Sequence, residues 1–121
     1  MYHQIANWLD NVLSQCIPED VIAFGFNLYD DEDNRWSMEL VGTNSFDRGD
    51  ADWCCDEATD FGTREKPFTW EENAAWDNIL EKITLCLKEY LENGKYADVL
   101  KDKNGIGVGF VDGDLEIIYT K

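Results

Sequence analysis

The sequence predicts an α+β fold, with an antiparallel sheet of two hairpins covered on one face by an N-terminal helix and a long central helix. Two observations predict it. Apolar residues recur at helical spacing in two segments, and elsewhere they alternate with polar residues on both sides of two turns. The chain has 121 residues, of which 44% are hydrophobic, so its core needs no metal ion or disulfide bond. No repeat or linker divides the sequence, and we expect a single domain over residues 1–121.

The first half of the chain predicts a helix followed by a hairpin. Apolar residues at positions 5, 8, 9, 12 and 13 form one helical stripe, and the helix should end before Pro18. Two alternating strands, 21–29 and 35–42, then flank the polar turn "DDEDN" at 30–34. The side chains that should face the helices are Ile22, Phe24, Phe26, Trp36 and Met38.

The second half predicts a long helix and a second hairpin. Residues 43–68 are irregular, with one further short strand around 52–57. Thr69 and Glu72 form a capping-box pattern that should begin the helix, and Asn93–Gly94 should end it. Its buried stripe would be Trp76, Ile79, Leu80, Ile83, Leu87 and Leu91. Another helical turn or two should follow at 95–101. The last two strands flank the two-residue turn Asp112–Gly113, with Ile106, Val108, Phe110, Leu115 and Ile117 facing the helices.

No segment of the sequence forms a recognisable catalytic or cofactor-binding motif. His3 is the single histidine and stands at a terminus, and no serine lies in a motif such as G-x-S-x-G. The alternating glycines of "GIGVGF" at 105–110 are not a dinucleotide fingerprint, because a hairpin follows them instead of a helix. We therefore expect no enzymatic activity and no cofactor. Paired carboxylates performing acid–base chemistry are the remaining enzymatic alternative.

The same glycines predict a sheet face that is poor in side chains. Gly107 and Gly109 would lie on one face of their strand, next to Gly25 and Ala23 of the first hairpin. Such a face lets another segment approach closely. Close packing within this protein and a concavity for a partner both fit the pattern.

No metal site is expected. A calcium loop that starts at Asp31 or at Asp50 lacks the acid and the glycine required at its fifth and sixth positions. The four cysteines provide one adjacent pair and two single residues, which is not the paired spacing of a zinc site.

The cysteines indicate packing rather than redox chemistry. Cys54 and Cys55 are adjacent, and in an alternating strand one of them would be buried. The surrounding acids would raise the pKa of these thiols, which disfavours a reactive thiolate. Cys16 and Cys86 are expected to be small core residues.

Charge is the strongest global signal. Twenty-six acids and ten bases give a net charge of −16, which disfavours nucleic acid and anionic membranes as partners and favours basic proteins. The N-terminal segment lacks the features of a signal peptide, and no apolar run reaches the roughly 18 residues of a membrane span. We therefore expect a cytoplasmic location, where the cysteines stay reduced.

The acids are concentrated in residues 30–60, which hold 11 acids and 2 bases. Because loops on a rigid scaffold often form binding surfaces, we expect this region to contact a protein partner, with Trp53 or Trp36 as an apolar anchor. For Trp53, packing under its own loop is the alternative. The predicted contact residues are Asp30, Asp31, Glu32, Asp33, Trp36, Asp50, Asp52, Trp53, Asp56, Glu57 and Asp60.

The segments "ELVGTNSFDRGDADWCCDE" and "GKYADVLKDKNGIGVGFVDGDLEIIY", in a small acidic α+β chain, resemble the immunity proteins of bacterial polymorphic-toxin and contact-dependent inhibition systems. The resemblance implies a protein that binds and neutralises a cognate toxin domain, often a basic nuclease. It implies no residue-level role. An acidic adaptor, or an accessory subunit of a cytosolic complex without a toxin, is the alternative function.

Overall fold

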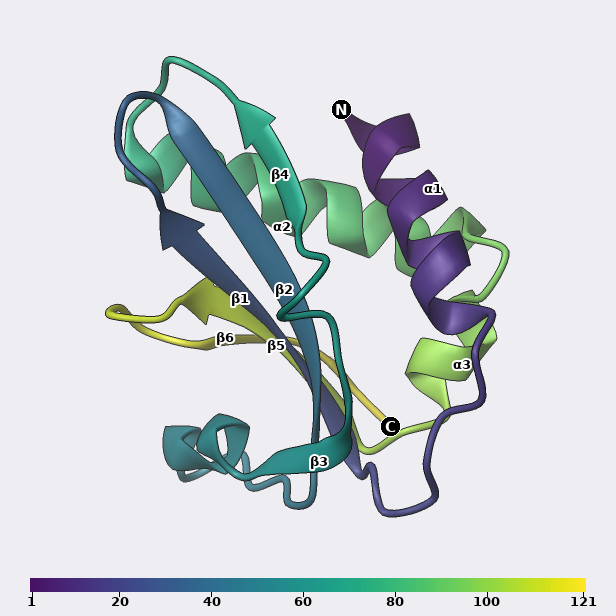
Figure 1. Ribbon diagram of the computed structural model, residues 1–121. Coiled ribbons are helices and arrows are strands. Elements are labelled where there is room, and N and C mark those ends of the chain that lie inside the picture. The colour runs from purple at the N-terminus through teal and green to yellow at the C-terminus, as the bar shows by residue number, and fades with distance from the viewer.

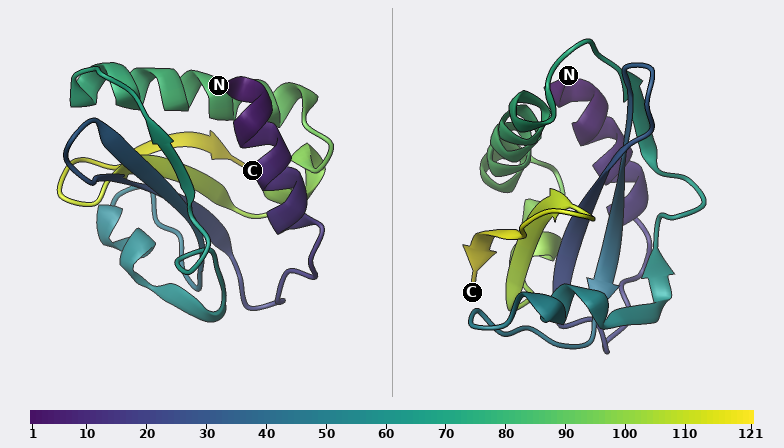
Figure 2. Two further views of the ribbon diagram at one scale, coloured as in Figure 1. Left: turned by 45° about the horizontal axis from the view of Figure 1, so that its top comes forward. Right: turned by 90° about the vertical axis from the view of Figure 1, so that its left-hand side faces the viewer.

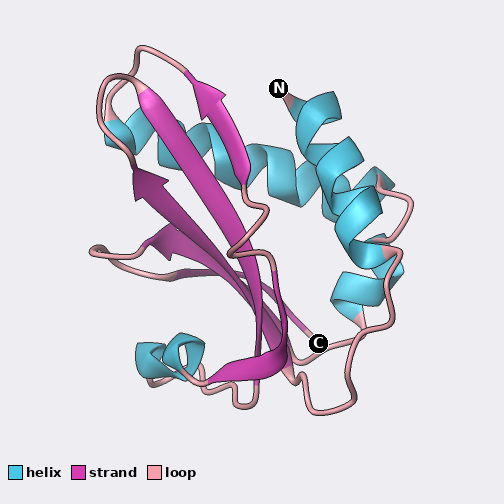
Figure 3. Ribbon diagram, viewed as in Figure 1, coloured by secondary structure: helices cyan, strands magenta, loops and turns pink.

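The chain forms a six-stranded sheet with helices on one face in a computed structural model (Figures 1 and 3). The structure describes the backbone of residues 1–121 and all side chains except those of Ala51, Thr59 and Asp60. The helices are α1 (Tyr2–Leu13), α2 (Trp76–Asn93) and α3 (Ala97–Lys101), with a 3-10 helix η1 (Ala51–Cys55). The strands are β1 (Ala23–Asp30), β2 (Arg35–Thr43), β3 (Glu57–Gly62), β4 (Phe68–Glu71), β5 (Gly105–Phe110) and β6 (Glu116–Thr120).

The α+β class and the two predicted hairpins are confirmed, but the sheet is mixed and has more strands than predicted. The strand order is β3-β2-β1-β5-β6, and β4 also pairs with β2. The β1–β2 and β5–β6 pairs are antiparallel, whereas β1 and β5, which join the two hairpins, run parallel. The chain returns between the hairpins through α2 and α3, which lets β5 align with β1 in the same direction.

The core lies between the helices and one face of the sheet. Phe24, Phe26 and Leu28 of β1 are almost fully buried, and they pair with residues of β5 whose side chains share that face. The buried helix residues that pack against them are Ile5, Leu9 and Leu13 of α1, Ile79, Ile83 and Leu87 of α2, and Leu100 of α3. The predicted core is correct for β1 and β2 except at Ile22, which is 36% exposed because β1 begins one residue later.

The long helix begins at Trp76, not at Thr69. Residues 68–71 form β4 instead, where half-buried Phe68 and Trp70 alternate with exposed neighbours and pair with Met38 and Trp36 of β2. The capping-box pattern is therefore overridden by sheet pairing. As a result Trp76, expected in the buried stripe, is 61% exposed, while the predicted end at Asn93–Gly94 is confirmed.

Three further predictions about residues 52–117 are wrong. The segment expected to be a strand around 52–57 is mostly the helix η1, and β3 follows it. The last hairpin is joined by the five residues 111–115, so Asp112–Gly113 is not a two-residue turn. Leu115 lies against Gly107, and Ile117 pairs with Gly107, so both belong to the face opposite the helices.

Candidate functional site

The sheet face opposite the helices is covered by η1 and by the β5–β6 connection. Figure 2 shows η1 and α2 on opposite sides of the strands. A Cβ atom on Gly25 would lie 2.5 Å from Cys54 Sγ, and one on Gly107 would lie 3.1 Å from the Trp53 ring. Gly25 and Gly107 are paired residues of β1 and β5. Of the two interpretations of the glycine-rich face, close packing within the protein is therefore correct.

Both tryptophans expected to anchor a partner are buried. Trp53 is 3% exposed and its ring meets that of Phe46 edge-on at 4.9 Å. Trp36 is 5% exposed and its Nε1 donates to the Glu72 carbonyl. The hypothesis of Trp53 or Trp36 as an apolar anchor at the surface therefore does not fit the structure, because both indoles support the fold from inside.

The adjacent cysteines lie in η1 rather than in a strand. Cys54 is half-buried above Gly25, and Cys55 is exposed. Burial, followed by the charges of Cys55, Glu57 and Glu39, raises the pKa of Cys54 to about 11, in the predicted direction. Cys86 packs partly against the core, but Cys16 is exposed just after α1, so the prediction that it is a core residue is wrong.

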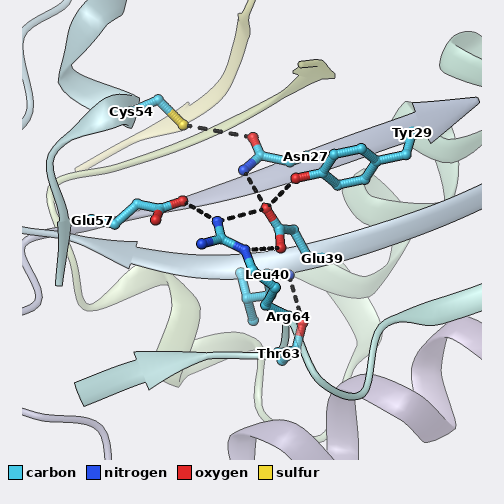
Figure 4. Close-up of polar contacts among 8 residues, drawn as sticks. All are labelled: Asn27, Tyr29, Glu39, Leu40, Cys54, Glu57, Thr63 and Arg64. Carbon is cyan, nitrogen blue, oxygen red and sulfur yellow. Dashed lines mark hydrogen bonds and ion pairs between the residues drawn. The ribbon is translucent and has the colours of Figure 1, made fainter. Parts of the chain in front are cut away.

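A buried carboxylate organises the polar part of this face (Figure 4). The side chain of Glu39, on β2, is only 2% exposed. Its Oε1 accepts hydrogen bonds from Tyr29 Oη at 2.6 Å and from Asn27 Nδ2 at 3.1 Å. Arg64 contacts both Glu39 oxygens, at 3.1 and 3.2 Å, and also reaches Glu57 at 2.7 Å. The network therefore ties the β3–β4 link to the centre of the sheet.

Glu39 is held in its ionised form. Burial alone would favour the neutral acid, but the hydrogen bonds from Arg64, Tyr29 and Asn27 outweigh it and lower the pKa of Glu39. Burial and the hydrogen bond to Glu39 raise the pKa of Tyr29 to about 12. Glu39 and Cys54 thus provide neither a proton acceptor poised near neutrality nor a thiolate.

We expect Glu39→Gln to lower the free energy of unfolding by about 1 kcal/mol at neutral pH, because a neutral amide accepts weaker hydrogen bonds than a carboxylate. The folded-state pKa of Glu39 lies below its usual value of 4.5, so the stabilisation is present above that value and is lost as the pH falls through the folded-state pKa. Urea unfolding across acidic and neutral pH measures this loss. The difference from wild type should vanish in acid, whereas Glu65→Gln, at an exposed neighbour of Arg64, should cost little at any pH. A difference that does not change with pH contradicts the assignment.

Two hollows flank Arg64. One, of about 500 Å³, is bounded by the Glu39 network, Asp52, Asp114 and Leu115. The other, of about 830 Å³, lies between α1 and the β3–β4 link, with Trp8 and Phe61 in its wall. Trp8 Nε1 donates to the Lys66 carbonyl there, which joins α1 to that link.

The predicted contact residues fall into two separate groups. Asp30, Asp31, Glu32 and Asp33 lie at the β1–β2 turn, and Asp50, Asp52, Asp56 and Glu57 lie on and beside η1 at the other end of β2. The nine residues of β2 between them span about 26 Å. The structure therefore provides two acidic surfaces and not the single surface that the sequence suggested. The side chain of Asp60 lies outside those that the structure describes.

Several of these acids have structural roles. Asp50 caps η1 by accepting from the Asp52 backbone N–H, and Asp56 accepts from Ser45 Oγ at 2.7 Å. Glu57 pairs with Arg64. In contrast Asp31, Glu32 and Asp52 expose their side chains, and none has a side-chain hydrogen bond or ion pair among the described residues.

The roles of Glu39 and Arg64 and the exposure of Trp76 were not identified from the sequence. Glu39 alternates with buried Met38 and Leu40, which normally indicates a solvent-facing residue. Its signal would have been the polar side chains of Asn27 and Tyr29 at neighbouring positions of the paired strand. Trp76 was assigned to a helix that was expected to begin seven residues earlier.

The fold and this face define a small acidic α+β domain with a mixed sheet, covered by helices on one side and by η1 on the other. Among the described side chains, no group of three histidine, cysteine or carboxylate residues could hold a metal ion. In the part of the chain that the structure describes, no helix combines the length and apolarity needed to cross a membrane. Comparisons with protein-family models, curated proteins and solved structures find no match.

Proposed function

We propose that this chain is a non-enzymatic protein-binding domain whose partner is a basic protein. Following the resemblance to immunity proteins, we assign it the neutralisation of a cognate bacterial toxin domain, such as a nuclease, in the cytoplasm. The observation that carries the proposal is the net charge of −16, combined with carboxylates that stand exposed in loops.

The two acidic surfaces support this proposal through their free carboxylates. Asp31 and Glu32 lie in the turn that joins β1 and β2, Asp52 lies in η1, and none of the three is neutralised by a side-chain partner among the described residues. Such charges attract a basic protein from a distance and increase its association rate. Fast capture suits the neutralisation of a toxin, and carboxylates can occupy the positions where a nuclease holds phosphates.

We expect the triple variant Asp31→Lys, Glu32→Lys and Asp52→Lys to slow association with the partner by about tenfold or more at low salt. These three acids have exposed side chains, so the fold should be retained. The partner is sought by co-expression with the polypeptide encoded next to this chain, with rescue from toxicity and co-purification as readouts. Stopped-flow mixing at several salt concentrations then measures association.

The matched control replaces Glu89, Glu92 and Asp98, which are exposed on α2 and α3, with lysine. It changes the net charge equally but leaves both acidic surfaces intact. Equal association rates for the two triple variants would contradict a role for these surfaces. Co-purification without rescue from toxicity would instead identify an adaptor, and no binding to any basic neighbour would contradict the proposal itself.

A further inference from the structure

The exposed tryptophan of this protein lies at the end of the sheet formed by the β1–β2 turn. Trp76 is the first residue of α2 and is 61% exposed. The segment before it is fixed to the turn, because the Glu72 backbone N–H donates to the Asn34 carbonyl at 2.8 Å and Trp36 Nε1 donates to the Glu72 carbonyl at 2.9 Å. Trp76 is therefore presented on an anchored part of the chain.

Aromatic packing holds one side of the Trp76 ring and leaves the rest in water. Its ring meets Phe110 edge-on, with centroids 6.1 Å apart, and Phe110 in turn meets buried Trp36 at 6.0 Å. Trp76 and Phe110 thus form a small apolar surface, which we call the Trp76 surface, and it is connected to the core through Trp36.

Two acidic segments lie beside the Trp76 surface. Segments 30–35 and 71–77 hold seven acids and one base. They meet at this end of the sheet, since Arg35 pairs with Glu71 and the Glu72 backbone N–H donates to the Asn34 carbonyl. The base is Arg35, and its Nη2 lies 3.7 Å from Asp33 Oδ2. The nearby Lys82 is paired with Glu72 at 3.0 Å.

We propose that the Trp76 surface is the apolar anchor through which this chain binds its basic partner. An arginine or lysine side chain of the partner stacks its cation on the indole, while the surrounding carboxylates meet the charge. Tryptophan is the aromatic residue best suited to this contact and is enriched among residues that dominate interfaces. This inference rests on the proposed function and replaces Trp53 and Trp36 as the anchor.

Charge favours a cationic side chain of a partner over the other possible occupants of the Trp76 surface. A second copy of the chain would bring a net charge of −16 against an equally acidic surface. The positive end of the α2 dipole lies at Trp76, but Asp77 in the first turn opposes it. A cationic protein side chain is therefore the occupant that matches both the indole and its surroundings.

The test uses hexa-arginine as the basic probe and hexa-citrulline as its neutral analogue. Fluorine NMR of protein labelled with 5-fluorotryptophan resolves the five tryptophans, and the variant Trp76→Phe assigns the resonance of Trp76. Hexa-arginine should shift that resonance more than the other four. Trp76→Ala should weaken hexa-arginine binding by about two- to fivefold, since an exposed cation–π contact contributes that much.

The matched control is Leu85→Ala. Leu85 is also 61% exposed on α2, but it lies nine residues further along the helix, among both acidic and basic neighbours. Leu85→Ala should leave the affinity for hexa-arginine unchanged. An unshifted Trp76 resonance with equal affinity of both variants overturns this inference but leaves a basic partner in place. Failure of hexa-arginine to bind any variant also overturns this inference, whereas the proposed function is decided by the co-expression experiment; dimerisation abolished by Trp76→Ala identifies a second copy as the occupant and overturns the inference too.

Discussion

Trp53→Ala should lower the free energy of unfolding by about 3–5 kcal/mol, the usual cost of removing a large buried aromatic side chain. Trp53 is 3% exposed, meets Phe46 edge-on and approaches Gly107 from above. Alanine would leave a cavity between η1 and the glycine-rich face. Urea unfolding monitored by far-ultraviolet circular dichroism measures the loss without relying on tryptophan fluorescence.

Trp53→Phe is the control for this experiment. The indole Nε1 of Trp53 is buried and has no hydrogen-bond partner among the described protein atoms, so phenylalanine keeps the aromatic packing and gives up no polar contact. Trp53→Phe should lower the free energy of unfolding clearly less than Trp53→Ala does. A loss below about 1 kcal/mol for Trp53→Ala would show that this side chain does not hold η1 in place. Trp53 would then again be a candidate contact for a partner.

The parts of the fold that the sequence predicts correctly are those whose signal is local. Alternation in 21–29 and 35–42 predicts the first hairpin, and the stripe beginning at Ile5 predicts α1. The parallel pairing of β1 with β5 has no local signal, because it joins segments some eighty residues apart. Around Thr69 the local signal is misleading, since pairing of Phe68 and Trp70 with β2 outweighs a capping pattern.

The candidate site was less predictable than the fold because it depends on which side chains are covered. Composition identifies the acidic character, but it does not show that the acids form two groups at opposite ends of β2. Composition also does not show which tryptophans are buried and which is exposed. Trp36 and Trp53 are enclosed by residues distant in sequence, whereas Trp76 is exposed because its helix begins there.

Gly109→Ala should lower the free energy of unfolding by about 2–3 kcal/mol, toward the upper end of the usual cost of overpacking. A Cβ atom at this position would collide with the backbone carbonyl of Asp114 and lie 3.2 Å from Leu115 Cα. Because those atoms belong to the backbone, the β5–β6 connection would have to move away from the sheet. Thermal or urea unfolding measures the change.

Gly113→Ala provides a control in that same connection. Its Cβ atom would meet no atom closer than 3.7 Å, and its φ angle is negative, so alanine fits without strain. Alanine there restricts the unfolded chain and should raise stability by about 0.4–1 kcal/mol. Opposite signs at positions 109 and 113 would show that the glycine-rich face requires its glycines where the chain packs against itself. Equal effects at the two positions would instead show that the β5–β6 connection does not pack closely against β5. A partner could then contact the glycine-rich face.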